Sequence, residues 1–547
     1  MKKRILACGE FTQLSTGYAV YMRGLLTFLH NNGYDVIELA CACIEGDRRL
    51  ENVPWKVIAN IPHQSNTGAL EKYNNFPSSE YGAWQFENIV NNFRPDVVID
   101  IRDNWHYEFQ LRSPLRDYFS SVIMPAIDAE PQNKSWLNFH SKADAVLSYT
   151  QWGIDIMNSS GFKINTIGAT PPIASPEFVP YFGKKQDIKN ELGLGDKIVI
   201  GMVGRNQKRK LYPNLFSAFS EVSKRVDNAV LLIHTKFPDR GWAIDEEIVK
   251  YDIADKVYIT YVCNQCGTVK PSLYKGVTGY CDKCGYANSA VTSNSDVGIS
   301  NADMVKLYNS MDLYVQWHTN EGYGIPAMEA LACGVPIVGV DYSAVSEVLT
   351  LGGGYKIPPI GFTQEIETGR KFAVPDDAEL TNYIYEFCML PTQIRAKMGV
   401  IARMHYDANW NIENSYKNWI KAIESVKPKK SWNNPPEVHQ IPQSFPTGMN
   451  NIDFAEWLIT EVLNKREYIG SEMHARLLRD LNDSITPGGF GGMYYHEINS
   501  CVFKDDQKYI PFSQSDAFNL FKTMAEINNI WEQERVAKNE SLVHISQ

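Results

Sequence analysis

Two separated runs of the chain alternate short apolar segments with amphipathic ones. The first run opens with "KRILACGEF", a polar loop and "GYAVYMRGLLTFLHNNGY", and the second with "KIVIGMVG" (197–204), a polar loop and "PNLFSAFSEVSKRV". The apolar segments predict buried strands, and the helical spacing after each one predicts a helix. This alternation is typical of doubly wound, mostly parallel sheets, which bind ligands at the carboxyl ends of their strands. We therefore expect an α/β protein with two Rossmann-like domains facing a cleft.

The 547 residues exceed what one hydrophobic core usually organises, so the chain should divide further. Residues 405–425 predict a helix that closes the second Rossmann-like domain. A segment rich in Pro, Asn and Lys follows and lacks any period, which is typical of a linker. We expect a first domain at 1–190, a second at 191–426, a linker at 427–449 and a mainly helical accessory module at 450–547.

The overall charge and the apolar runs limit the partners of the chain. A net charge of −10 and a pI near 5.7 oppose long-range capture of a polyanion, although a local basic groove could still bind one. The apolar stretch after "MKKR" is too short for a signal peptide, and no run reaches membrane-spanning length. These features favour a cytoplasmic protein without a transmembrane segment.

The stretch "HTNEGYGIPAMEALACGVP" (318–336) follows a predicted strand and leads into a helix. Gly324 and its neighbours can aim backbone N–H groups at an anion, because a helix N-terminus has unpaired donors and a positive dipole end. Glu329 lies about one turn into the helix and could accept hydrogen bonds from the vicinal hydroxyls of a ribose. Glu321 would lie nearer the reacting end. The alternative is a pair of surface carboxylates beside an ordinary turn.

A second loop, "GMVGRNQKRK", also follows a strand. Arg205 comes directly after Gly204, and Lys210 follows five residues later, so two cations could hold a pyrophosphate. They would stabilise the negative charge of a departing diphosphate. We interpret Lys208 and Arg209 as solvated neighbours.

These two loops, together with "ALACGVPIV" and "SEVL", resemble glycosyltransferase family 4, the retaining nucleotide-sugar enzymes of GT-B fold. The resemblance is strong over residues 197–425, weaker over the first 190, and absent from the cysteine-rich segment and the tail. It implies that the first domain holds the acceptor side and the second binds the nucleotide sugar. It also implies retention of anomeric configuration without a catalytic metal. The residues it assigns are Arg205, Lys210 and Gly204 on the donor diphosphate, Glu329 on the ribose, and Glu321 with Gly322, Tyr323 and Gly324 on the transferred sugar.

The first domain offers fewer assignable residues. "GEFTQLSTGYA" resembles the glycine loop of the family, which makes Gly17 a candidate donor contact, although a routine turn explains it as well. The family often places a histidine from this domain near the transferred sugar. His106 is our catalytic candidate, with Asp103 and Asp128 as further acidic groups that match no motif; a structural role for the histidine is the alternative.

Four of the ten cysteines form a C-x2-C-x14-C-x2-C pattern: Cys263, Cys266, Cys281 and Cys284. Two thiolate pairs on glycine-containing turns predict a zinc ribbon, here an insertion over 258–295. Four cysteine ligands leave no open coordination position, so the Zn²⁺ would be structural rather than catalytic. The insertion could bind the acceptor, mediate a homo-oligomer contact, or simply staple a long loop.

The sequence therefore predicts a retaining glycosyltransferase that moves a hexosyl or pentosyl group from a nucleoside-diphosphate sugar to a hydroxyl acceptor. A glycan or glycoconjugate acceptor is favoured over modified DNA. Three alternatives remain at this point: a viral enzyme that glycosylates a hydroxylated DNA base, a catalytically silent donor-binding subunit, and an epimerase or phosphorylase on the same fold.

Overall fold

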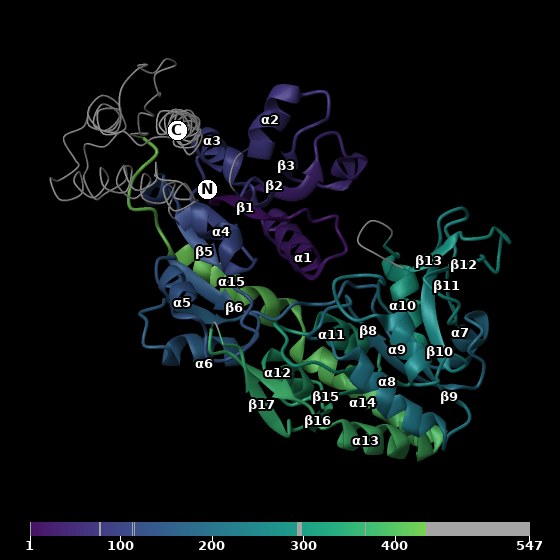
Figure 1. Ribbon diagram of the computed structural model, residues 1–547. Helices are drawn as coiled ribbons and strands as arrows, with labels where there is room; N and C mark the ends of the chain where they lie inside the picture. The colour runs from purple at the N-terminus through teal and green to yellow at the C-terminus, as the bar shows by residue number, and fades with distance from the viewer. Residues whose placement is uncertain are drawn as a thin grey trace, which may run out of the picture.

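The computed structural model describes residues 2–433 except 76–77, 112, 114, 293–297 and 367. Two α/β domains lie side by side, each built on its own parallel sheet (Figure 1). The predicted accessory module at 450–547 and residues 434–449 of the predicted linker lie outside the described residues. Within the described part, no helix is both long and apolar enough to span a membrane.

The first sheet has seven parallel strands in the order β3-β2-β1-β4-β5-β6-β7. Its inner strands are buried along most of their length, because helices cover both faces of a parallel sheet. The strands are β1 (Arg4–Glu10), β2 (Asp35–Ile44), β3 (Lys56–Ile61), β4 (Val97–Asp100), β5 (Ser120–Ile123), β6 (Ala145–Ser148) and β7 (Thr166–Ala169). The α-helices are α1 (Gly17–Asn31), α2 (Thr67–Asn75), α3 (Ala83–Phe93), α4 (Asn104–Leu111), α5 (Lys134–His140) and α6 (Gln151–Ser159).

The second sheet has nine strands, with the parallel core in the order β10-β9-β8-β14-β15-β16. Its core strands are β8 (Ile198–Val203), β9 (Ala229–His234), β10 (Val257–Cys263), β14 (Leu313–Gln316), β15 (Ile337–Val340) and β16 (Tyr355–Ile357). The associated helices are α7 (Lys185–Glu191), α8 (Tyr212–Ser223), α9 (Ile244–Lys250), α10 (Asn301–Ser310), α11 (Ile325–Ala332), α12 (Ala344–Leu351), α13 (Asp377–Met389) and α14 (Thr392–Asn409). A hairpin of β17 (Gly361–Gln364) and β18 (Lys371–Val374) stands apart from this sheet.

The cysteine-rich segment extends the second sheet at one edge. Three short strands, β11 (Val269–Leu273), β12 (Thr278–Gly279) and β13 (Ala290–Thr292), add to it in antiparallel pairs. The strand β10 pairs in parallel with β9 and antiparallel with β11 and β13, so it belongs both to the main sheet and to the predicted insertion. The cysteine-rich segment is therefore held directly by a strand of the core.

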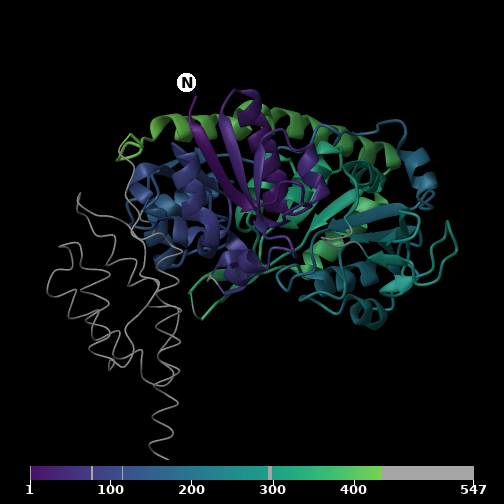
Figure 2. The ribbon, with the colours of Figure 1, turned by 90° about the horizontal axis from the view of Figure 1, so that it is seen from above.

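The last described helix departs from the sequence prediction. Residues 405–425 do not form one helix that closes the second domain: α14 ends at Asn409, and α15 (Ile412–Ser425) packs against β6 and β7 of the first sheet. The indole N–H of Trp419 donates to the hydroxyl of Tyr21 at 2.8 Å, and Lys3 donates to the carbonyl of Ile423 at 2.6 Å. Figure 2 shows this long green helical segment running across both domains. Helical periodicity predicts that one face of α15 is buried, but it does not specify that this face packs on the first sheet.

The chain then stays on the first domain as far as it is described. Lys430 donates its backbone N–H to Asp117 at 2.8 Å, and the indole of Trp432 donates to the carbonyl of Pro95 at 3.0 Å. The start of the predicted linker therefore lies against the first domain.

Candidate active site

Glu321 is a buried carboxylate in the loop between β14 and α11, with 7% of its surface exposed. The Lys210 ammonium contacts it directly, and the Arg209 guanidinium lies 2.7 Å away. Burial alone would raise the pKa of Glu321, but Arg209 and Lys210 hold that pKa well below its usual range. Two cations therefore share a desolvated site with the Glu321 carboxylate, and the Asp128 and Asp103 carboxylates act electrostatically on Arg209 as well.

The residue immediately before the next helix, α11, has a backbone conformation that favours glycine. Gly324 precedes its first residue with a φ of +94°, and an added Cβ there would lie 3.0 Å from Val345. The Tyr323 side chain is buried beneath this turn, where its hydroxyl accepts a hydrogen bond from Trp410 and its ring lies 5.8 Å from that of Tyr149. A donor contact at residue 323 would therefore come from the backbone rather than the ring.

Glu329 lies on α11, about one turn from the start of the helix. The Tyr308 hydroxyl donates to one of its carboxylate oxygens at 2.8 Å, so that side of the group is held in place. Burial raises the pKa of Glu329 to about 7, and the Tyr308 hydrogen bond opposes that rise only in part. A carboxylate poised near neutrality can accept hydrogen bonds from a diol once it is deprotonated.

The loop after β8 arranges its cations differently from the sequence interpretation. Arg209 is no solvated neighbour: it donates to the Asn320 carbonyl at 3.1 Å besides contacting Glu321. Arg205, by contrast, is 64% exposed at its side chain and pairs with Asp239 at 3.0 Å. The structure therefore brings Arg209 and Lys210 together on Glu321, with Arg205 at the rim of the same loop. Gly204 lies beside them, since an added Cβ there would come within 3.8 Å of Lys210.

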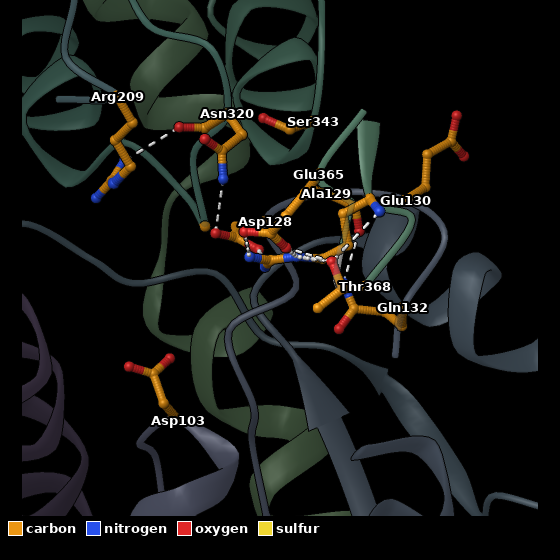
Figure 3. A network of polar contacts seen from close by, with 12 residues as sticks. Asp103, Asp128, Ala129, Glu130, Gln132, Arg209, Asn320, Ser343, Glu365 and Thr368 are labelled. Carbon is orange, nitrogen blue, oxygen red and sulfur yellow. Dashed lines mark hydrogen bonds and ion pairs between the residues drawn. The ribbon is translucent and has the colours of Figure 1, made fainter. Parts of the chain in front are cut away.

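The first domain faces this site through three loops. A Cβ added to Gly17, at the start of α1, would lie 3.3 Å from Ile325 at the start of α11, so the glycine loop meets the second domain there. Asp128 accepts from Asn320 at 2.7 Å and from Arg370 at 3.0 Å, which makes it a bridge between the domains. Figure 3 shows Asp103 and Arg209 on one side of this Asp128 network. Asp103 accepts from the Tyr18 hydroxyl at 2.9 Å.

His106 is not brought into contact with Glu321. It lies on α4, where its ring packs 4.4 Å from that of Tyr81 and 5.4 Å from that of Trp105. Burial lowers its pKa to about 4, so the imidazole is neutral at pH 7. This packing is compatible with the structural alternative for His106.

The four predicted zinc ligands converge. Their sulfur atoms all lie within 4.8 Å of one another, with Cys263–Cys284 at 3.6 Å and Cys266–Cys281 at 3.7 Å. Zn–S bonds of about 2.3 Å in a tetrahedron separate the sulfurs by roughly 3.8 Å, so this set fits such an ion. Backbone N–H groups at the turns also point to sulfur, as in the 3.4 Å contact from Cys266 to Cys263. Thiolates held in this way suit a structural metal.

Other residues of the site were missed by sequence reasoning. Ser343, at the start of α12, exchanges hydrogen bonds with the Glu321 backbone at 3.0 and 3.1 Å. His318 has a buried Nε2 with no hydrogen-bond partner among the described residues. Arg370 reaches Asp128 from the β17–β18 hairpin, across 242 residues of sequence. The basic run around Arg209 was the one visible signal; nothing in the sequence marked Arg370 or Ser343.

Comparison with known proteins supports a glycosyltransferase of GT-B type. Residues 297–387 match the family described as glycosyl transferases group 1. Sucrose-phosphate synthase from Thermosynechococcus elongatus aligns with a TM-score of 0.53 and 16% identity over 77% of this chain and 98% of that one. Anabaena HepE in complex with UDP and glucose aligns with a TM-score of 0.55 and 14% identity, over 78% of this chain and 100% of that one. No curated protein sequence gives a significant match.

A third solved structure is WaaG, a glycosyltransferase involved in lipopolysaccharide biosynthesis. It aligns with a TM-score of 0.50 and 13% identity over 77% of this chain and 98% of that one. The chain therefore has the GT-B fold, with two parallel-sheet α/β domains, as the sequence predicted.

Proposed function

We propose that the chain transfers a sugar from a nucleoside-diphosphate sugar to a hydroxyl acceptor, with retention of anomeric configuration. The observation that carries the proposal is the buried Glu321 carboxylate with Lys210 and Arg209 at the carboxyl ends of β14 and β8. Two cations held together in a desolvated site favour a departing diphosphate. The group 1 family match covers the loop that carries Glu321.

Each residue of the second domain would then have a defined task. Lys210 and Arg209 would hold the donor phosphates, with Arg205 joining from the rim, because cations placed before the reaction need no reorganisation during it. Glu329 would accept hydrogen bonds from the ribose hydroxyls. Glu321 and the N–H groups at Gly322 to Gly324 would orient the transferred sugar.

The reaction breaks the bond between the anomeric carbon and the diphosphate oxygen and forms a bond from that carbon to the acceptor oxygen. Departure and attack on one face retain the configuration, and the acceptor proton passes to the departing phosphate oxygen. The protein contributes mainly position and charge. Uridine diphosphate sugars come first among candidate donors, since HepE has been crystallised with UDP-glucose.

We also propose that Cys263, Cys266, Cys281 and Cys284 bind one structural Zn²⁺. Four sulfurs at tetrahedral separations support this assignment. The ion would link the two turns that follow β10 and precede β13, and its binding would stabilise the segment between them.

A thermal-shift screen of the zinc-loaded protein tests the donor assignment. A nucleoside diphosphate that binds the folded state raises Tm by mass action. We expect Tm to rise with the nucleoside diphosphate of one base and with its sugar, and this rise should be lost in Lys210→Ala. The anomeric NMR signal of the product should then show that the configuration of the donor sugar is retained. No shift with any nucleotide would remove the diphosphate site from the proposal.

A further inference from the structure

The β17–β18 hairpin crosses from the second domain to the first beside the reaction site. Its strand β18 is bonded to both domains: the Ala373 backbone N–H donates to the Thr319 carbonyl at 2.9 Å, and that of Lys371 donates to the Glu130 carbonyl at 2.8 Å. The Tyr342 hydroxyl donates to the Lys371 carbonyl at 2.7 Å. Figure 2 shows the green hairpin beside the blue part of the first domain. The hairpin is therefore anchored on both domains.

Three aromatic side chains meet at this junction. Trp105 on α4 is 49% exposed, and its ring centroid lies 6.1 Å from that of Trp136 on α5. The Arg370 guanidinium stacks over Trp136 at 5.1 Å and over Phe372 at 5.5 Å. We call Trp105, Trp136, Phe372 and Arg370 the aromatic shelf. A half-exposed tryptophan close to a candidate reaction site is typical of a binding surface.

The aromatic shelf is continuous with the reaction site through one residue. Arg370 donates to Asp128, and Asn320, the neighbour of Glu321, donates to the other oxygen of the same carboxylate. An added Cβ at Gly322 would lie 4.0 Å from the Asp128 Cβ, so the Asp128 side chain adjoins the loop that carries Glu321. A molecule resting on the shelf would extend towards Glu321.

The charges around the shelf favour an uncharged occupant. Its own cation, Arg370, is already held by Asp128 at 3.0 Å and by Glu365 at 3.1 Å. Asp103, two residues before Trp105, is a further carboxylate of the first domain and accepts a hydrogen bond from the Tyr18 hydroxyl. A phosphodiester chain needs unpaired Lys or Arg side chains, and carboxylates repel it. Carboxylates do accept hydrogen bonds from hydroxyl groups, and aromatic faces pack on the apolar face of a sugar ring.

We propose that the aromatic shelf binds a sugar ring of a neutral saccharide acceptor and that Asp128 directs its reacting hydroxyl towards Glu321. This inference rests on the proposed function and adds the acceptor class to it. Trp105 and Trp136 would supply the stacking faces, and Arg370 would position both Trp136 and Asp128. A nucleic-acid acceptor is the competing outcome.

Saturation-transfer NMR on the full-length protein tests the shelf with defined probes. The probes are neutral oligosaccharides of glucose, galactose and mannose, and a duplex containing hydroxymethylated cytosine, each with the nucleoside diphosphate present. We expect saturation transfer to at least one saccharide, weakened about 10-fold or more in affinity in Trp105→Ala and Trp136→Ala. The matched control is Tyr286→Ala, an aromatic that is 63% exposed on the cysteine-rich segment.

The outcomes separate the inference from the proposed function. Nucleotide-induced thermal shifts preserved in both tryptophan variants, with saccharide signals lost, support the shelf. Two variant results would overturn the shelf: saccharide signals that are unchanged in Trp105→Ala, or signals that are lost instead in Tyr286→Ala. Two wild-type results would do the same: no signal for any saccharide, or a signal for the duplex alone. All four leave the donor site intact. If no nucleotide produces a thermal shift in the wild-type protein, the proposed function itself is contradicted.

Discussion

The Arg209 guanidinium lies 2.7 Å from the Glu321 carboxylate and joins the loop after β8 to the loop after β14. Lys210 contacts the same carboxylate oxygen from the next position in the chain. Consecutive residues therefore converge on one buried anion, although the sequence marked only Lys210 as a site residue and Arg209 was interpreted as a solvated neighbour. Glu321 therefore holds both cations in place where a donor diphosphate would contact them.

This arrangement predicts unequal roles for two arginines. Arg209→Ala should lower donor turnover about 10²-fold, in the range seen when one contact to a developing anion is lost. Arg205→Ala should cost less than about 10-fold, because its side chain is 64% exposed and engaged with Asp239. Steady-state kcat/KM with the donor sugar measures both. If kcat/KM fell more in Arg205→Ala than in Arg209→Ala, Arg205 would be the residue that contacts the phosphates.

Loss of either partner in the central ion pair should be severe. Lys210→Ala leaves Arg209 alone against Glu321, and Glu321→Gln removes the buried anion while keeping its shape. We expect each change to cut transfer by about 10²-fold or more. Circular dichroism and Tm would establish that both variants fold. Near-normal transfer in the two folded variants contradicts the assignment of the site.

Donor binding should depend on pH through Glu329. Its pKa in the folded protein is raised to about 7, so the carboxylate gains a proton as pH falls below that value and loses acceptor capacity for the ribose. Between pH 8 and pH 6 we expect nucleoside-diphosphate affinity to fall about 10-fold more in the wild type than in Glu329→Gln. Calorimetric titration of both proteins gives this difference and cancels the titration of the nucleotide itself. Parallel curves would show that Glu329 does not contact the ribose.

The same raised pKa affects stability in a defined direction. Relative to the unfolded chain, Glu329 favours the folded state below its ordinary pKa, and that contribution is lost as pH rises through about 7. Glu329→Gln should therefore gain in Tm relative to the wild type above pH 7, without ligand. A constant difference between the two proteins from pH 5 to pH 8 would contradict the shift.

Metal removal should loosen the cysteine-rich segment before the rest of the protein. We expect one zinc per chain by elemental analysis, and a lower Tm after chelation or in Cys281→Ser, because the ion links the turn after β10 to a second turn that lies between the short strands β12 and β13. Hydrogen exchange should increase over 263–292 and stay unchanged in β1 to β7. Cys333→Ser, at a buried cysteine remote in sequence from the cluster, is the control for thiol loss. Full protection of 263–292 after chelation would contradict a structural metal.

Short-range patterns account for the parts of the molecule that were predicted. Apolar runs such as 198–203 became buried parallel strands, because only a strand covered on both faces needs apolar residues at every position. The C-x2-C spacing brought four sulfurs together, since each pair sits on its own tight turn. The apolar runs and the C-x2-C spacing are both patterns of residues close together in the sequence, so they can be recognised without the tertiary structure.

The sequence by itself therefore determined the two α/β domains, the cysteine cluster and the loops that carry Glu321 and Lys210. Only the tertiary structure decided that α15 packs on the first sheet, that Arg209 rather than Arg205 contacts Glu321, and that Arg370 reaches Asp128. The physical reason is that these choices depend on which distant surfaces meet. Helical periodicity states that a face will be buried but not against what, and a charged side chain in a loop pairs with whichever opposite charge the packing of the two domains brings within reach.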